Sequence, residues 1–177
     1  LHLAYSFELL RKELSTDTIQ NSIDYFYSST KDGWPCWSFS NHDVKRHISR
    51  WSEDKSNLCD LAKISCALLL SLKGTVCIYQ GEELGQTETK LEFKELTDPL
   101  GIEFWPEEAG RDGCRTPMVW NSQKLNADFS EVKPWLPVKK EQKQKSVDLQ
   151  EDKNDSVLSF YRKMIKARKK NFGREIY

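Results

Sequence analysis

The stretch Leu58–Gly85 reads LCDLAKISCALLLSLKGTVCIYQGEELG, and it contains a helix, a strand and a polar loop in succession. Apolar residues fall nearly all around Leu58–Leu72, which predicts a well-buried helix that ends at Gly74. The β-branched, apolar run Thr75–Tyr79 predicts a buried strand. The loop Gln80–Gly85 then follows the carboxyl end of that strand.

The same alternation of strands and helices precedes this stretch. Trp34–Phe39 predicts a short strand, and Ser15–Ser29 has the apolar spacing of a helix with Thr16 as its N-cap. The apolar, aromatic run Leu1–Leu10 predicts a buried strand that continues into a loop. Helices of this length are typical crossovers between parallel strands, so the fold class is α/β.

Three strands cannot close a barrel, and a parallel sheet needs cover on both faces. The 177 residues are therefore expected to be part of a larger fold. The first residue, Leu1, is not an initiator methionine, which agrees with a chain that starts inside a longer protein.

The region after the third strand is less regular. Gln86–Leu149 holds five of the six prolines and shows few periodic runs, and a loop of this length usually has a function. Within it, Lys139–Lys145 (KKEQKQK) is expected to be a solvated surface loop. A final helix is predicted over Val157–Lys170, and Asp155 or Ser156 caps it. Asn57 or Ser56 is expected to cap the helix that starts at Leu58 in the same way.

Composition excludes several classes of partner and site. The 27 basic and 27 acidic residues cancel, so neither nucleic acid nor an anionic membrane is expected as a partner. The longest apolar run, Ile64–Leu72, is far shorter than the roughly 18 residues that cross a bilayer. Five cysteines without a CxxC pair argue against zinc and disulfides, and reduced thiols favour a cytoplasmic location. Phosphate-binding glycine loops, HExxH and GxSxG do not occur, so no cofactor or metal is expected.

A polar cluster stands at the carboxyl end of the predicted strand Trp34–Phe39. It comprises Asn41, His42 and Asp43, with Arg46 shortly after them. Ligands of parallel α/β folds bind at this end of the strands, where a His–Asp pair can hydrogen-bond neighbouring sugar hydroxyls. A carboxylate there can also stabilise positive charge that develops on a sugar ring. The alternative is an Asx-type turn in which Asp43 caps the next segment.

A second cluster, Gly110–Pro117 (GRDGCRTP), places two arginines and an aspartate on an irregular backbone. Arginine can fork across two hydroxyls or a carboxylate, although a salt-bridged structural loop is the alternative. Glu82 and Glu83 follow the third strand and suggest acid–base work. Neighbours on an extended chain point in opposite directions, so one of the two is expected to be structural.

Taken together, these segments resemble the α-amylase family of glycoside hydrolases (glycoside hydrolase family 13), in its α-glucosidase and oligo-1,6-glucosidase group. The stretches that carry the resemblance are FSNHDVKRHISRW (Phe39–Trp51), LLLSLKGTVCIYQGEELG (Leu68–Gly85), DPLGIEFWPEEAGRDGCRTPMVW (Asp98–Trp120), KPWLPV (Lys133–Val138) and SVLSFYRKMIKARKKN (Ser156–Asn171). They cover essentially the whole chain in the family's order. The resemblance implies a partial TIM (β/α)8 barrel, with residues 1–177 spanning strands six to eight, the long segment after strand eight and the closing helix.

The resemblance also implies roles for single residues. Asp43 matches the carboxylate that stabilises the oxocarbenium-like transition state, and His42 matches its neighbour at the same subsite. Arg111 matches an arginine that contacts the non-reducing glucose, although Arg115 is close enough in sequence to hold that role instead. Arg46, in the first of these stretches, is assigned to substrate binding as well.

The family's nucleophile and acid/base follow strands four and five, which would precede Leu1, and its C-terminal β-sandwich would follow Tyr177. The resemblance implies a fragment of a retaining, exo-acting α-glucosidase that acts on a small oligosaccharide or disaccharide, and the fragment alone is expected to be inactive. Transglycosylation or sucrose isomerisation on the same scaffold is one alternative. A non-catalytic relative, like the heavy chains of amino-acid transporters, is another.

Overall fold

A computed structural model of the chain describes residues 3–30, 32–52 and 56–172. Its sheet has three parallel strands in the order β1 (Leu3–Tyr5), β2 (Trp34–Trp37) and β3 (Thr75–Val76). Leu3 pairs with Trp34 and Cys36 pairs with Thr75, so the strands lie in their chain order. The predicted parallel α/β arrangement is therefore present.

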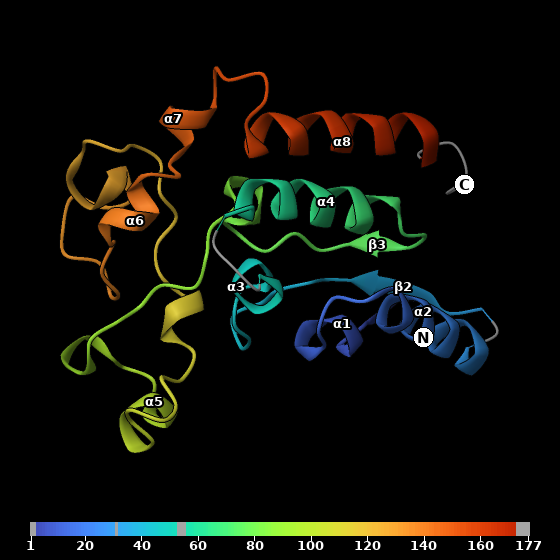
Figure 1. Cartoon of the computed structure of the whole chain (residues 1–177), viewed down its shortest axis with the longest axis horizontal. Coiled ribbons are helices and arrows are strands. Elements are labelled where there is room, and N and C mark those ends of the chain that lie inside the picture. The colour runs from blue at the N-terminus through green and yellow to red at the C-terminus, as the bar shows by residue number, and fades with distance from the viewer. Residues whose placement is uncertain (1–2, 31, 53–55, 173–177) are drawn as a thin grey trace.

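Helices connect and cover the strands. Two longer helices, α2 (Thr16–Ser29) and α4 (Leu58–Ser71), are the two crossovers, and α8 (Val157–Phe172) runs side by side with α4 (Figure 1). The shorter α1 (Glu8–Arg11) and α3 (His47–Trp51) follow the first two strands. No helix within the described residues is both long and apolar enough to cross a membrane.

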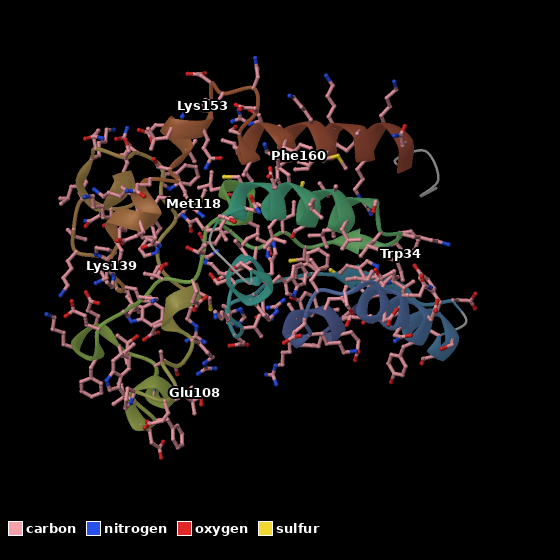
Figure 2. The ribbon with its side chains drawn as sticks, viewed as in Figure 1. Trp34, Glu108, Met118, Lys139, Lys153 and Phe160 are labelled. Atoms are coloured by element: carbon pink, nitrogen blue, oxygen red, sulfur yellow. The ribbon has the colours of Figure 1, made fainter. Side chains whose placement is uncertain are left out.

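Two apolar clusters hold these elements together. One joins α2 and α4 across β2, and the other joins α4 to α8, where Phe160 packs against it (Figure 2). Burying apolar surface of this kind is the main favourable contribution to folding. The buried members of the first cluster are Leu9, Trp37, Phe39, Trp51, Leu69 and Leu72, and those of the second are Ile48, Ala62, Cys66, Leu70, Val157 and Tyr161. We call residues 3–85 together with α8 the layered part.

Residues 86–149, which we call the connecting segment, lie beside the layered part (Figure 1). They contain only short elements, as the sequence predicts. Smaller apolar clusters stabilise them, such as Leu91, Leu96 and Leu136. The elements are η2 (Phe93–Glu95), α5 (Pro99–Glu103), η3 (Asp112–Cys114), η4 (Leu125–Asp128), α6 (Lys140–Lys143) and the first part of α7 (Val147–Gln150).

Several predicted boundaries in the layered part are wrong. Ser15, rather than Thr16, is the N-cap of α2, because its hydroxyl accepts the Thr18 N–H at 3.0 Å. The strand predicted over Leu1–Leu10 covers only Leu3–Tyr5 of the described residues, and α1 follows it. Leu1 itself lies outside the described residues.

The helix α4 also differs from its prediction. The helix ends at Ser71, three residues before Gly74, and Asn57 holds the N-cap position without a side-chain cap hydrogen bond. Ile64 is 60% exposed, so the apolar residues do not bury the helix all around. The strand predicted over Thr75–Tyr79 is regular only at its first two residues.

Two further predictions concern the end of the chain. The final helix is confirmed, and the Ser156 hydroxyl accepts the Ser159 N–H at 3.1 Å beside its first turn. The expectation of a solvated loop over Lys139–Lys145 is wrong, because α6 forms there and buries Gln142. The Gln142 amide donates to the Thr116 hydroxyl at 2.6 Å, which ties the helix to the GRDGCRTP stretch.

Candidate functional site

Asp43 lies in the loop after β2, where the sequence predicts a ligand site. Its backbone N–H donates to the Asn41 side-chain oxygen at 2.8 Å, so the Asx-type turn is present. Asn41 supplies the turn, and Asp43 does not cap the next helix, since α3 has no side-chain cap hydrogen bond. The Asp43 carboxylate is 44% exposed and remains available for other partners.

Both arginines of the GRDGCR stretch reach this carboxylate. Arg111 Nη1 lies 3.3 Å and Arg115 Nη2 lies 3.1 Å from the same oxygen, Asp43 Oδ1. The second oxygen, Oδ2, lies 3.4 Å from Nε2 of the exposed His42. The chain thus brings together residues that are 68 and 72 positions apart. Three of the predicted site residues, His42, Asp43 and Arg111, form one cluster.

Arg115 is held differently from Arg111. Its Nε donates to the His42 backbone carbonyl at 2.7 Å, so this arginine fixes the loop as well as the Asp43 carboxylate. Arg115 also borders a hollow of about 360 Å³, together with Glu83, Trp120 and Phe129. The hollow gives an open, partly aromatic surface next to the cluster.

Arg111 binds a second carboxylate, Asp98, which sequence reasoning missed. Arg111 Nε and Nη2 donate to Asp98 Oδ2 and Oδ1 at 2.8 and 2.9 Å, and the Arg111 backbone N–H donates to Oδ2 at 2.7 Å. The Arg111 guanidinium, with its paired hydrogen bonds, holds the pKa of Asp98 well below its ordinary value. Asp98 precedes Pro99 at the start of α5, where an aspartate usually signals only a helix cap.

Two glycines allow this ion pair to form. A side chain on Gly101 would meet the Ala109 carbonyl oxygen at 2.5 Å, and one on Gly110 would meet the Gly101 nitrogen at 2.7 Å. Gly110 also has a φ of +66°, which side chains rarely adopt. The two backbones lie in direct contact, and this contact brings Asp98 at the start of α5 beside Arg111.

Arg46 does not join the cluster around Asp43. Only 1% of its surface is exposed, and its Nη1 and Nη2 donate to the carbonyls of Gln80 and Cys114 at 2.6 and 3.0 Å. The guanidinium also lies over the Tyr79 ring, 5.1 Å from its centroid. Arg46 thus acts as a buried brace: it links the loop after β3 to the GRDGCR stretch through hydrogen bonds. The expectation that Arg46 contacts substrate is therefore corrected.

The paired glutamates after β3 differ in their surroundings. Glu82 is buried, with Oε1 3.2 Å from His47 Nδ1, whereas Glu83 is half-buried and borders the hollow. They lie in a short 3₁₀ turn, η1 (Glu82–Leu84), and not on the extended chain that the sequence suggested. Burial raises the pKa of Glu83 above its ordinary value.

The cysteines and potential metal ligands of the described residues form no site of their own. All five cysteines are free thiols, and Cys59 and Cys77 are exposed. Across residues 3–30, 32–52 and 56–172, no group of three or more His, Cys, Asp and Glu side chains is arranged to hold a metal ion.

Comparison with known proteins gives consistent matches. The sequence model of the protein family described as the α-amylase catalytic domain matches residues 4–175. A probable α-glucosidase of Rhizobium meliloti (strain 1021) is 45% identical over 172 residues, which are 97% of this chain and 31% of that protein. The oligo-1,6-glucosidase of Heyndrickxia coagulans is 33% identical over 160 residues, which are 80% of this chain and 29% of that protein.

A solved structure matches as well. An α-glucosyl transfer enzyme, XgtA, superposes with a TM-score of 0.86 at 43% identity, covering 94% of this chain and 31% of that one. The chain therefore spans about a third of the length of the proteins that it matches.

Proposed function

The chain belongs to the α-amylase catalytic-domain family, and from this premise we propose that its natural protein is a retaining, exo-acting α-glucosidase. The substrates would be short oligosaccharides or disaccharides, from which terminal α-linked glucose is removed. The observation that carries the proposal is the Asp43 carboxylate. Two arginines hold one of its oxygens, and the other oxygen lies beside the exposed His42.

This arrangement suits a transition state with positive charge on a sugar ring. Asp43 Oδ1 is fixed by guanidinium groups, so the carboxylate is oriented before the substrate arrives. Oδ2 and His42 Nε2 are placed to bind neighbouring hydroxyls of the glucose unit, and negative charge on the carboxylate stabilises the oxocarbenium-like ring.

We assign the sugar-binding arginine to Arg115 in preference to Arg111. The Arg111 fork is occupied by Asp98, whereas Arg115 borders the hollow of about 360 Å³ next to Asp43. Arg46 becomes a positioning residue, because its guanidinium holds the Cys114 carbonyl directly before Arg115.

Hydrolysis with retention needs two further carboxylates about 5 Å apart, a nucleophile and an acid/base. We assign neither role to a residue of this sequence. In this proposal β1, β2 and β3 are strands six, seven and eight of a (β/α)8 barrel, and residues 1–177 form the C-terminal portion of that barrel. The two other carboxylates would then come from the loops after strands four and five of the natural protein.

A second candidate function is transfer of the glucosyl group to a sugar hydroxyl instead of water. The similarity to the α-glucosyl transfer enzyme favours it. Both functions use the same Asp43 site and differ in the acceptor.

The test is an assay of the natural protein that carries this sequence, after its intact mass has been measured. We expect release of glucose from maltose or isomaltose, with the α-anomer formed first in a proton NMR time course. Formation of longer saccharides at high substrate concentration would favour the transfer function. Absence of both activities, or initial formation of the β-anomer, would overturn the proposal.

A further inference from the structure

Asp98 is a buried carboxylate on the far side of Arg111 from Asp43. Its side chain has no exposed surface, and it takes two of the guanidinium nitrogens of Arg111 and the backbone N–H of the same residue. Paired hydrogen bonds of this kind are strong and fix the plane of the guanidinium. Arg111 is therefore held at both its backbone and its side chain.

The backbone around Asp98 is held in turn by Asp112. Asp112 Oδ2 accepts the N–H groups of Thr97 and Asp98 at 2.6 and 2.8 Å, and Asp112 is fully buried. This second carboxylate contacts backbone groups and the Thr97 hydroxyl, and within residues 3–30, 32–52 and 56–172 it forms no ion pair. Asp112 fixes the position of Asp98, and Asp98 fixes the position of Arg111.

The two oxygens of the Asp43 carboxylate therefore have different partners. Arg111 faces Asp43 with Nη1, at 3.3 Å from Oδ1, because the hydrogen bonds of its Nε and Nη2 to Asp98 fix the orientation of the guanidinium. Within the described part of the chain, the group at ion-pair distance from Oδ2 is His42 Nε2, at 3.4 Å. A guanidinium without Asp98 would be free to fork across both oxygens of Asp43, which is the preferred geometry of an arginine and a carboxylate.

The charges of the cluster agree with this division. Asp43 and Asp98 balance Arg111 and Arg115, so the four side chains are neutral together. Loss of the charge on Asp98 would leave one excess positive charge beside a ring that becomes positive in the transition state. That charge would oppose the stabilisation that Asp43 provides.

We propose that Asp98 is a positioning residue of the sugar site, which confines Arg111 to Oδ1 of Asp43 and so leaves Oδ2 to the substrate. The inference rests on the proposed function, because it concerns the same site. It differs in what it claims: a buried aspartate that touches no substrate determines how strongly the glucose unit is bound.

The test is steady-state kinetics of the natural protein with 4-nitrophenyl α-D-glucopyranoside. We expect Asp98→Asn to raise KM by about tenfold, and to lower kcat by less than that, because the freed Arg111 competes with the sugar for Oδ2. The double variant Asp98→Asn/Arg111→Gln should bring KM back to within about threefold of the unaltered protein, because the competing group is gone. A purely structural role would instead make the two losses add.

Glu95→Gln is the matched control, since Glu95 accepts from Lys139 Nζ at 2.5 Å in the same segment and belongs to another ion pair. Its KM should stay unchanged. An Asp98→Asn protein with KM within about twofold of the unaltered one would overturn the inference, as would a double variant with KM no lower than that of Asp98→Asn.

Two outcomes separate this inference from its premise. If the unaltered protein acts on no α-glucoside, the proposed function fails and the inference falls with it. If the unaltered protein is active and the variants behave as a structural role predicts, only the inference fails. Should Asp98→Asn not fold, the double variant decides alone: KM within about threefold supports the inference, and a larger increase overturns it.

Discussion

Leu69 in the layered part and Asp112 in the connecting segment are both 0% exposed, yet one is apolar and the other is charged. Leu69 of α4 packs in one cluster with apolar side chains of β2 and α2, whereas Asp112 accepts backbone N–H groups. Large apolar clusters thus stabilise the layered part, whereas the connecting segment combines small apolar clusters with polar groups that hold its backbone. This difference matters because the second region supplies both arginines of the site.

The largest expected effect comes from a substitution at the site that leaves the apolar clusters and the buried polar groups unchanged. Asp43→Asn should lower kcat by about a thousandfold, since it removes charge that stabilises the transition state. The carboxylate is 44% exposed, so the unfolding temperature should change little. Assay of released glucose with differential scanning calorimetry checks both statements. Near-normal turnover would remove Asp43 from the catalytic role.

A substitution in the layered part should lower the stability of the protein and leave its catalysis unchanged. Leu69→Ala is expected to lower the free energy of unfolding by about 3 kcal/mol, because it opens a cavity in a closed apolar cluster. KM should stay unchanged. Urea unfolding followed by circular dichroism measures the loss, and Ile64→Ala on the exposed face of α4 is the control. Equal losses in the two variants would contradict the burial assigned to α4.

Arg46→Met tests whether polar braces hold the connecting segment. It leaves the carbonyls of Gln80 and Cys114 without their donors, so we expect a loss of about 2 kcal/mol in unfolding free energy. The value of kcat/KM should also fall, since Cys114 directly precedes Arg115. In the control Arg162→Met, an exposed pair with Glu151 is removed and less than about 1 kcal/mol should be lost. An Arg46 variant with full stability would show that the brace is dispensable.

The smallest expected effect is on the stability of the protein at low pH. The pKa of Asp98 is held below its ordinary value of 3.8, so the folded state binds this proton less readily than the unfolded chain. The stability that Asp98 contributes is therefore fully present well above pH 3.8 and is lost as the pH falls below that value. The stability difference between the unaltered protein and Asp98→Asn should stay constant from pH 7 down to about pH 5 and should shrink as the pH falls below about 4. Curves that diverge on acidification would contradict the depressed pKa.

Sequence patterns predicted the layered part well, because its elements depend on local periodicity. The helices α4 and α8 and the parallel strands follow from apolar spacing that neighbouring residues display. The errors lie at the ends of elements, where a single hydrogen bond decides. The Ser15 hydroxyl, for instance, moves the cap of α2 by one residue.

The connecting segment was predictable only through the resemblance to a family. Its contacts join residues far apart in sequence, such as Asp43 and Arg111, and no local pattern shows them. The sequence placed His42, Asp43 and Arg111 at one site, and the structure brings them together. It missed Asp98 and misjudged Arg46, because burial of a charged side chain depends on which distant carbonyls or cations it meets.

The close contact of Gly101 and Gly110 has a consequence for how this protein can vary. Neither position has space for a methyl group, so a random library of the region should return inactive clones at both codons. A change at one glycine also cannot be compensated by a change at the other, since a side chain at either position would meet main-chain atoms of the facing segment. Laboratory evolution of new specificity should therefore leave residues 101 and 110 untouched and randomise positions around the hollow, such as Trp120 and Phe129.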